Sequence, residues 1–365
     1  MKILLAGGGT AGHINPALAI AGYIKEKEPS SEILFVGTKK GMESSLVPKS
    51  GYTIKYVEVE GLSKKLTIKN IRSLIHMITA KGKCKKIIKE FRPDVVIGTG
   101  GYVCAPAVMA ANSLGVPTLI HEQNVFPGSA IKLLSKTSSV TAISFDDSRK
   151  YLADAKEIIF SGNPIRPSVL KSDRESARAS LGLGEEKFLV IFGGSLGAAK
   201  INSVALAYIG SGMLPPECRV LFATGERNYN EVETMIGAEN ISVPENVEVV
   251  PYIHNMDEVM SASDLLVCRS GAITVSEISA LGKPSVLVPS PNVTNNHQEY
   301  NARALSDSGA AITILEKDFN VESLASAVES VFGNDSFAME MSKKSKEKGC
   351  VDALDIIYKK LKELI

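Results

Sequence analysis

The chain carries the same succession of apolar segments and glycine-rich loops twice. Each apolar segment is short and ends in a loop of glycines or other small residues. Apolar segments without polar alternation, separated by helix-length stretches, are typical of parallel strands covered by helices on both faces of a sheet. We therefore predict an α/β fold with two Rossmann-like, doubly wound parallel-sheet domains. Three segments of the first half have counterparts in the second: residues 2–12 and 188–198, 94–106 and 264–277, and 115–124 and 282–291.

The sequence indicates a domain boundary after Asn163, where an apolar segment gives way to a proline-containing stretch and then to a polar one. A chain of 365 residues is also long for one hydrophobic core. We expect domains at residues 1–163 and 164–340, followed by a helical segment at 341–365. Four apolar residues of that segment recur at helical spacing and predict one buried face: Leu354, Ile357, Leu361 and Ile365.

Composition excludes several classes of protein. A net charge of +1 argues against general nucleic-acid binding. Five cysteines form no close CxxC pair, which suits a reducing compartment, and the first apolar stretch is too short for a signal peptide. The uncharged stretch between Asp94 and Glu122 contains glycines and prolines that favour strand, loop, helix and strand over a membrane span. No HxH, HExxH or DxD pattern occurs, so we expect neither a metal nor another cofactor.

The first glycine loop, "GGGTAG", fits an anion-binding turn between a strand and a helix, because helix N-termini favour phosphate. Gly7, Gly9 and Gly12 also match the GxGxxG pattern of dinucleotide-binding proteins, but the second strand ends without the acidic residue that a ribose requires. A tight turn without a ligand is the remaining alternative. His13 directly follows the loop and is not needed to bind phosphate.

The corresponding loop of the second half has two interpretations. Residues 193–197 fit GxSxG, the nucleophile elbow of serine hydrolases, for which His254 or His297 could supply the histidine. The matching loop of the first half has glycines and Thr10 where a nucleophile would be needed. We therefore favour Ser195 as a hydrogen-bond donor to phosphate.

Glu277 and Arg166 are candidates for binding a nucleotide sugar. We place Glu277 early in a helix that follows a third loop, where a carboxylate suits the helix dipole. It is either an ordinary helix charge or an acceptor for two ribose hydroxyls. Arg166 is the best-placed cation to stabilise a departing diphosphate, and an ordinary surface charge in the linker is the alternative.

The stretch from residue 61 to 89 contains nine basic residues and no acidic one. Isoleucines and leucines lie between them. The stretch is either a solvated basic helix packed on the sheet or a basic, partly apolar surface that rests on anionic lipid. The basic residues are Lys64, Lys65, Lys69, Arg72, Lys81, Lys83, Lys85, Lys86 and Lys89.

Seven ordered motifs together resemble one family of bacterial glycosyltransferases along essentially the whole chain. The family is that of the undecaprenyldiphospho-muramoylpentapeptide β-N-acetylglucosaminyltransferases. One departure is Ala11, which stands where the family commonly has glycine, and another is the absence of tryptophan from the chain. The motifs are "GGGTAGHINPALAIA", "GTGGYVCAPAVMAA", "HEQNVFPG", "GNPIR", "GGSLGAAKIN", "CRSGAITVSEISALGKP" and "NNHQEYNARAL".

The resemblance implies two Rossmann-like domains facing across a cleft, the GT-B arrangement, with a C-terminal helix that returns to the N-terminal domain. It implies an inverting, metal-independent transfer of N-acetylglucosamine from UDP-N-acetylglucosamine to the C4 hydroxyl of the muramoyl sugar of lipid I, which gives lipid II for peptidoglycan synthesis. It also implies a peripheral position on the cytoplasmic face of the plasma membrane, with the N-terminal domain on the acceptor and membrane side. Nucleic acid is not an expected partner.

The resemblance also implies roles for individual residues. Ile253 would offer its backbone to uracil, and Glu277 would accept the ribose hydroxyls. The acceptor diphosphate would contact Gly100, Gly101 and Tyr102. The donor would contact Thr10, Ala11, Gly12, Asn124, Arg166, Ser195, Ile253, Ala272, Ile273, Thr274, Val275, Ser276, Glu277 and Gln298.

His13 is the candidate catalytic residue. Displacement at an anomeric carbon needs a base for the incoming hydroxyl, and a histidine at the rim of the loop can supply it. Orientation of the substrate by a hydrogen bond is the alternative role for His13. At the level of the whole protein, another UDP-sugar enzyme, such as a glycolipid transferase or an epimerase, and a non-catalytic nucleotide-sugar binding protein are the alternatives.

Overall fold

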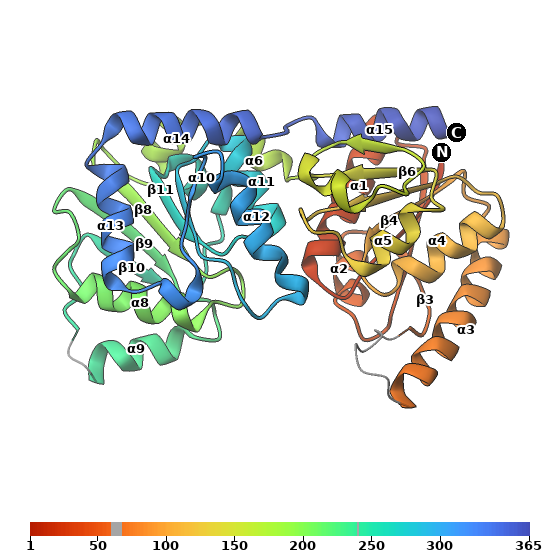
Figure 1. Cartoon of the computed structure of the whole chain (residues 1–365), viewed down its shortest axis with the longest axis horizontal. Helices are drawn as coiled ribbons and strands as arrows, with labels where there is room; N and C mark the ends of the chain where they lie inside the picture. Colours follow the sequence, from red (N-terminus) through yellow and green to blue (C-terminus); the bar gives the residue numbers. More distant parts are fainter. Residues whose placement is uncertain (60–67, 239–240) are drawn as a thin grey trace. The chain divides into compact units, whose positions relative to one another are not determined.

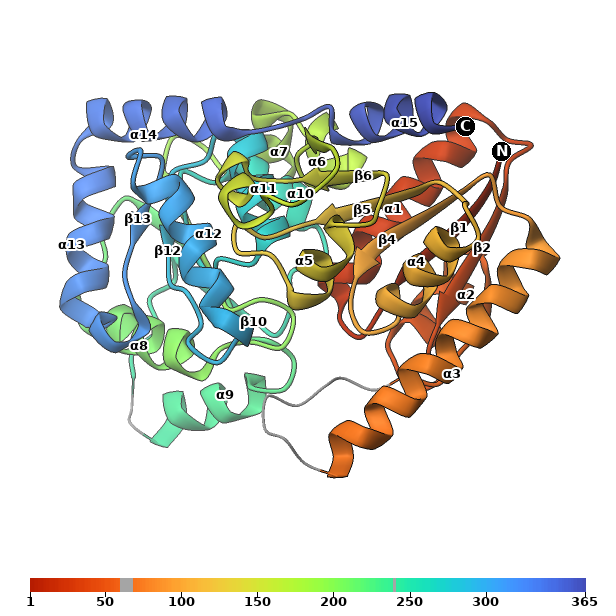
Figure 2. The same ribbon diagram turned by 45° about the vertical axis from the view of Figure 1, so that its right-hand side comes forward.

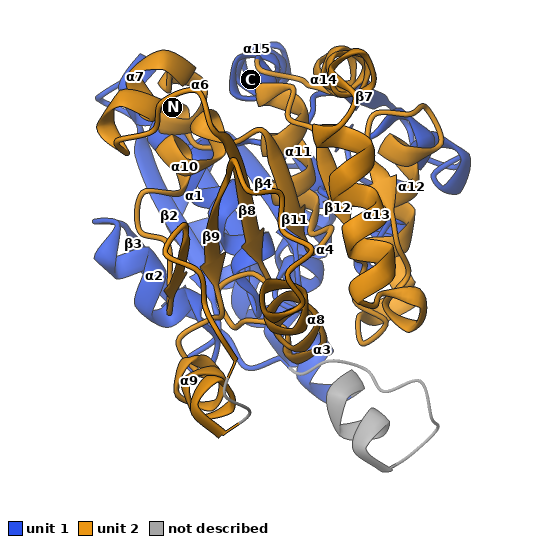
Figure 3. Ribbon diagram, turned by 90° about the vertical axis from the view of Figure 1, so that its left-hand side faces the viewer, with its two compact units in different colours: residues 1–165, 352–365 blue, residues 166–351 orange. Residues whose placement is uncertain are grey.

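The computed structural model describes residues 1–59, 68–238 and 241–365, and these form two compact units (Figures 1 and 3). Unit 1 comprises residues 1–165 and 352–365, and unit 2 comprises residues 166–351. Each unit is built on its own parallel sheet with helices on both faces. The predicted fold class of two Rossmann-like α/β domains is confirmed.

The described part of unit 1 contains a seven-stranded sheet in the order β3-β2-β1-β4-β5-β6-β7. Its strands are β1 Lys2–Gly7, β2 Glu32–Gly37, β3 Thr53–Tyr56, β4 Val95–Gly100, β5 Thr118–Glu122, β6 Val140–Ile143 and β7 Ile158–Phe160. Its helices are α1 Ala11–Lys27, α2 Glu43–Lys49, α3 Ile68–Phe91, α4 Cys104–Ser113, α5 Ser129–Ser135, the 3₁₀ helix η1 Asp146–Tyr151 and α15 Ala353–Leu364.

The described part of unit 2 contains a six-stranded sheet in the order β10-β9-β8-β11-β12-β13. Its strands are β8 Lys187–Phe192, β9 Cys218–Ala223, β10 Val247–Val250, β11 Leu265–Cys268, β12 Ser285–Leu287 and β13 Ile312–Thr313. Its helices are α6 Pro167–Lys171, α7 Arg174–Ser180, α8 Ala199–Gly210, α9 Tyr229–Ala238, α10 Met256–Ala262, α11 Ala272–Leu281, η2 Thr294–Asn296, α12 His297–Ser306, η3 Glu316–Asp318, α13 Val321–Phe332 and α14 Asp335–Lys348.

Alternate residues of β1 pack into different cores on the two faces of the unit 1 sheet. Leu4 joins the core formed with α3, α4 and α5, and Leu5 joins the core formed with α1 and α15. Figure 2 shows α3 and α4 on one side of the strands β1, β2 and β4, and α1 and α15 on the other. Ile357 and Leu361 of α15 are fully buried in the second core. Both faces of the sheet are therefore buried at its centre, which explains why β1 and β4 are largely apolar.

The uncharged stretch predicted as strand, loop, helix and strand forms β4, α4 and β5 as expected. Over the part of the chain that the structure describes, no helix combines the length and apolar character needed to cross a membrane.

The two units divide at residues 165/166 and 351/352, whereas the sequence predicts boundaries at 163/164 and 340/341. The later second division has a local cause, because α14 is held to the end of α11. Ser342 donates to the Gly282 carbonyl at 2.7 Å, and Lys346 donates to the Ala280 carbonyl at 2.6 Å. The predicted final helical segment is thus two helices, α14 in unit 2 and α15 in unit 1.

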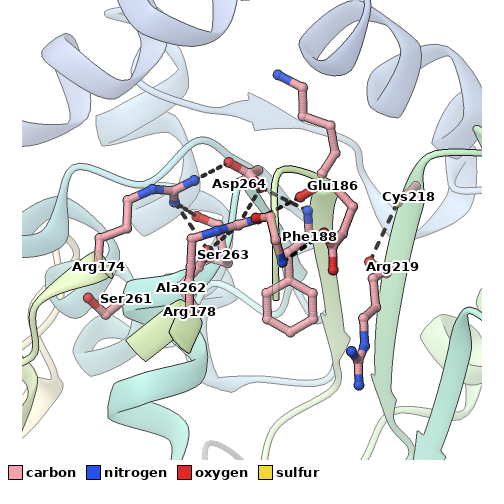
Figure 4. Close-up of polar contacts among 12 residues, drawn as sticks. Arg174, Arg178, Glu186, Phe188, Cys218, Arg219, Ser261, Ala262, Ser263 and Asp264 are labelled. Carbon is pink, nitrogen blue, oxygen red and sulfur yellow. Dashed lines mark hydrogen bonds and ion pairs between the residues drawn. The ribbon is translucent and has the colours of Figure 1, made fainter. Parts of the chain in front are cut away.

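Two arginines of α7 bind the residues at the end of α10 in unit 2 (Figure 4). Arg174 donates to Asp264 Oδ1 at 2.6 Å, and Arg178 donates to Asp264 Oδ2 at 3.2 Å. Lys283, 7% exposed, donates to the carbonyls of Ser261 and Ser263. Burial, helped by the neighbouring arginines, lowers the pKa of Lys283 to about 7.

We expect Lys283 to make the free energy of unfolding rise between about pH 7 and pH 10. In that range the unfolded lysine, with its usual pKa of 10.5, binds a proton that the folded lysine has lost. Stability then rises with pH by up to about 1.4 kcal/mol per unit. Urea unfolding at several pH values gives the free energies of unfolding of the wild type and of Lys283→Met. The difference between these two free energies should change with pH at this slope. A difference that does not vary with pH would contradict the assignment.

Candidate active site

Both sheets have a point where the strand order reverses, between β1 and β4 in unit 1 and between β8 and β11 in unit 2. Ligands of open α/β sheets bind beyond the carboxyl ends of the strands at such points. The loops predicted to bind phosphate follow these four strands. The topology therefore gives each unit one candidate site, and most of the predicted residues lie at these two places.

In unit 1 the loops after β1 and β4 are packed against each other through glycines. Gly8 N donates to the Gly100 carbonyl at 3.4 Å. A Cβ atom at Gly101 would lie 2.1 Å from the Gly8 oxygen, and one at Gly100 would lie 2.6 Å from His13 Cδ2. Gly101 also has a φ of +78°, which disfavours other residues. The predicted residues Gly100 and Gly101 are therefore required for this close approach.

His13 lies in the first turn of α1, beside both loops. Its Nδ1 is 3.2 Å from the Gly8 oxygen and 3.2 Å from Thr10 Oγ1. A carbonyl can only accept, so the bond to Gly8 requires the proton on Nδ1 and leaves Nε2 as the acceptor of the neutral ring. The main-chain oxygen of His13 accepts a bond from Thr99 Oγ1 at 2.7 Å. The neutral ring is thus held in the tautomer whose Nε2 can accept a proton.

The other predicted residues of unit 1 lie near the same edge of its sheet. Tyr102 is 60% exposed, and α1 begins at Ala11 without a side-chain cap on its first N–H groups. Asn124 follows β5, where its backbone N and Nδ2 donate to Glu122 at 2.9 and 3.2 Å. Burial raises the pKa of Glu122, whose carboxyl also accepts from Gly128 N at 2.8 Å. No motif in the sequence indicates that Glu122 holds Asn124.

In unit 2 the structure brings Arg166 and Glu277 together. Arg166 Nη2 and Nε lie 3.3 and 3.4 Å from Glu277 Oε1. Burial raises the pKa of Glu277, whereas Arg166 acts in the opposite direction. The expectation that Glu277 lies early in its helix is wrong, because α11 begins at Ala272 and its first turn holds no acidic residue. The negative charge of Glu277 is therefore stabilised by Arg166, not by the dipole of α11.

Gln298 lies at the start of α12 and is fixed by the loops after β11 and β12. Its Oε1 accepts from Ser290 N at 2.9 Å, and its main-chain oxygen accepts from Ser270 Oγ at 2.8 Å. Fully buried Asn301 donates to the Ser270 carbonyl at 3.2 Å. No local sequence pattern indicates Asn301, because its role depends on a contact with a residue 31 positions away.

Ser195 is exposed in the loop between β8 and α8, and α8 begins without a side-chain cap. Gly197 in that loop has a φ of +72°. The histidines that a hydrolase would need have other neighbours. His254 packs against the Tyr252 ring, and His297 Nδ1 is 2.8 Å from the Thr294 oxygen. The hydrolase interpretation therefore has no support in unit 2.

Ile253 follows β10 and is 5% exposed. Across residues 1–59, 68–238 and 241–365, no group of three or more His, Cys, Asp or Glu side chains is arranged to hold a metal ion.

The basic stretch forms α3, which packs on unit 1 through Ala80, Cys84 and Ile88. Ile75 and Ile78 of this helix are 55% and 65% exposed. Lysines with described side chains lie on the same helix: Lys81, Lys83, Lys85, Lys86 and Lys89. Lys64 and Lys65 and the side chains of Lys69 and Arg72 lie outside the described residues.

Both halves of the chain match domains of one glycosyltransferase family. Residues 3–143 match the glycosyltransferase family 28 N-terminal domain, and residues 188–357 match the glycosyltransferase family 28 C-terminal domain. The first match covers β1 to β6 of the unit 1 sheet, and the second covers the unit 2 sheet.

Curated relatives match over the full length. One from Caldanaerobacter subterraneus subsp. tengcongensis is 45% identical over 365 residues, which cover 100% of both chains. One from Acetivibrio thermocellus is 44% identical over 366 residues, which cover 100% of this chain and 98% of the relative. Both carry the name UDP-N-acetylglucosamine–N-acetylmuramyl-(pentapeptide) pyrophosphoryl-undecaprenol N-acetylglucosamine transferase.

Solved structures share the fold. The crystal structure of Acinetobacter baumannii MurG is similar with a TM-score of 0.81 and 25% identity over 99% of both chains. The UDP-GlcNAc 2-epimerase from Neisseria meningitidis, bound to UDP-GlcNAc, gives a TM-score of 0.68 at 14% identity over 100% of both chains. The second likeness concerns the fold alone.

Proposed function

Because the chain belongs to the family of UDP-N-acetylglucosamine–N-acetylmuramyl-(pentapeptide) pyrophosphoryl-undecaprenol N-acetylglucosamine transferases, we propose that it converts lipid I to lipid II. It transfers N-acetylglucosamine from UDP-N-acetylglucosamine to the C4 hydroxyl of the muramoyl sugar, with inversion at the anomeric carbon. The family resemblance predicted from the motifs is confirmed. Identity of 44 to 45% along the whole chain is the observation that carries the proposal.

Unit 2 is proposed to bind the donor. Glu277 accepts the two ribose hydroxyls, and Arg166, already beside that carboxylate, neutralises charge on the diphosphate. Ser195 and the first N–H groups of α8 and α11 donate to phosphate oxygens, since both helices begin without side-chain caps. The backbone of Ile253 contacts uracil. The other residues of unit 2 proposed to contact the donor are Gln298 and residues 272–276.

Unit 1 is proposed to bind the acceptor diphosphate at Gly100, Gly101 and Tyr102. Four residues of the same unit are proposed to contact the donor: Thr10, Ala11, Gly12 and Asn124. His13 acts as the general base, and the predicted alternative is that it only orients the substrate.

The reaction is a single displacement. Nε2 of His13 accepts the proton of the C4 hydroxyl as that oxygen forms a bond to the anomeric carbon, and the bond from this carbon to the UDP oxygen breaks. Negative charge develops on the departing UDP, where N–H groups and Arg166 stabilise it.

The test of this function is the release of UDP from UDP-N-acetylglucosamine with and without a short-chain lipid I analogue. Release that depends on the acceptor, together with formation of the disaccharide, is the expected result. Binding of UDP-N-acetylglucosamine without release would indicate a non-catalytic binding protein. Conversion of the donor sugar without any acceptor would indicate an epimerase.

Glu277→Ala is expected to raise the KM for UDP-N-acetylglucosamine about tenfold or more, because hydrogen bonds to a charged group contribute roughly 1.5–3 kcal/mol each. The turnover number should change much less, since the ribose contacts are formed in both ground and transition states. Steady-state kinetics measure both constants. Glu322→Ala, at an exposed residue of α13, is the control. An unchanged donor KM would remove Glu277 from the ribose site.

We also propose that unit 1 rests peripherally on the anionic cytoplasmic face of the plasma membrane through α3. Exposed Ile75 and Ile78 can enter the interface while the lysines of the helix meet lipid headgroups. Each cation close to such a surface contributes about 1 kcal/mol.

Replacement of Lys81, Lys83, Lys85 and Lys86 by glutamine is therefore expected to weaken sedimentation with anionic vesicles by at least about tenfold, most strongly at low salt. The control replaces four exposed lysines of unit 2: Lys171, Lys317, Lys343 and Lys348. Equal binding by the wild type and the α3 variant would show that α3 is a solvated helix.

A further inference from the structure

Glu43 is a buried carboxylate beneath the first glycine loop. It is the first residue of α2 and is 1% exposed. Its Oε2 accepts from Gly9 N at 2.9 Å, and its Oε1 accepts from Thr38 N at 2.8 Å and from Thr38 Oγ1 at 2.7 Å. The carboxylate thus joins the loop after β1 to the loop after β2.

Glycines from three positions make the space that Glu43 fills. A Cβ atom at Gly8 would lie 2.7 Å from Glu43 Oε1, one at Gly37 would lie 2.6 Å from Cγ, and one at Gly41 would lie 2.1 Å from Oε2. These contacts are too short for any side chain larger than glycine, so the surroundings are shaped around this carboxylate.

The hydrogen bonds favour the charged form of Glu43. Burial raises its pKa, but the bonds donated by Gly9 and Thr38 outweigh burial, so the pKa lies below its usual value. A neutral amide in the same place would have to turn an N–H group toward at least one of these donors. The three bonds therefore select a carboxylate over an amide of the same size.

The backbone that Glu43 holds is the backbone that orients His13. Gly9 has a φ of +86°, and the hydrogen bond from its N to Glu43 ties this backbone to α2. Its neighbour Gly8 supplies the oxygen beside His13 Nδ1. On the other side, Thr10 O accepts from His13 N at 3.1 Å.

We propose that Glu43 is a positioning residue for His13: it fixes Gly8 and Gly9 so that the imidazole ring faces the acceptor hydroxyl. The inference rests on the proposed function, in which His13 is the base. Glu43 itself contacts neither the substrate nor the reacting atoms.

The first experiment is Glu43→Gln, which keeps the volume of the side chain. We expect kcat to fall roughly 10- to 100-fold, since small misplacement of a catalytic group has effects of that order. The affinity for UDP, measured by calorimetry, should fall by a much smaller factor than kcat, because its proposed contacts with Arg166 and Glu277 are in unit 2 and only those with residues 10–12 adjoin the altered backbone. Thr38→Val, which removes one of the three bonds, should lower kcat by a smaller factor and serves if Glu43→Gln does not fold.

Glu28→Gln is the matched control, because Glu28 is a carboxylate of the same unit that binds Tyr358 and Lys362 of α15. We expect it to lower the melting temperature and leave kcat unchanged at a temperature where both variants are folded. An equal fall of kcat in both variants would overturn the proposal, since it would reflect loss of stability alone.

A double-mutant cycle tests whether Glu43 acts through His13. In the His13→Ala background, Glu43→Gln should lower kcat no further. Additive losses would overturn the proposal.

An NMR measurement separates this inference from the proposed function. The imidazole resonances of His13, assigned by their loss in His13→Ala, should shift in Glu43→Gln without any substrate. If they do not shift, the positioning role fails whatever reaction the enzyme performs. If they shift but the wild type transfers no sugar to lipid I, the proposed function fails alone.

Discussion

Replacement of His13 by alanine is expected to lower kcat for transfer to a lipid I analogue by about 10²- to 10⁴-fold, the usual contribution of general-base catalysis. The affinity for UDP-N-acetylglucosamine should change little, because the ring is proposed to act on the acceptor hydroxyl. Its Nδ1 bond to the Gly8 oxygen leaves Nε2 to accept the proton. Steady-state kinetics and calorimetry with the same protein measure the two effects.

His13→Gln distinguishes a base from a residue that only orients the substrate. Glutamine can donate to the Gly8 oxygen and bond a hydroxyl, but it cannot accept a proton at neutral pH. If His13 is the base, glutamine should be about as inactive as alanine. Activity of either variant within about threefold of the wild type would remove His13 from this role.

The two-sheet fold could be predicted from the sequence because strands that are buried on both faces form uninterrupted apolar segments. Leu4 and Leu5 are neighbours in β1 but enter different cores, so both had to be apolar. The boundary between the units near the C-terminus could not be read in the same way. Residues 341–351 resemble the rest of an amphipathic tail, and only the bonds from Ser342 and Lys346 to the end of α11 assign them to unit 2.

The candidate site could be predicted where a residue follows a strand, and not where its role comes from a distant contact. The glycine loops and His13 follow β1 and β4 directly, so the topology alone places them together. Glu43 is 34 residues from Gly9, and Arg166 is 111 residues from Glu277. No local pattern encodes such pairs, and the helix-dipole explanation of Glu277 was wrong for that reason.

Asp264→Ala is expected to lower the free energy of unfolding of unit 2 by about 2–4 kcal/mol. The carboxylate accepts from Arg174, from Arg178 and from Phe188 N, the last at 2.8 Å at the start of β8. Its removal leaves these two arginines as neighbouring cations without their anion, and uncompensated charge of this kind costs about 3–5 kcal/mol when fully buried. The side chain of Arg174 is 43% exposed, so we expect less than the upper value.

The control is Asp154→Ala, which breaks the exposed ion pair with Lys136 in unit 1. Such a pair contributes little to stability, because water screens both charges. Urea unfolding followed by hydrogen exchange of the β8 and β11 amides should therefore show a large loss of protection for Asp264→Ala and almost none for Asp154→Ala. A similar small loss in both variants would mean that the carbonyl groups at the end of α10 already satisfy Arg174, Arg178 and Lys283, and that Asp264 is not what holds α7 in place.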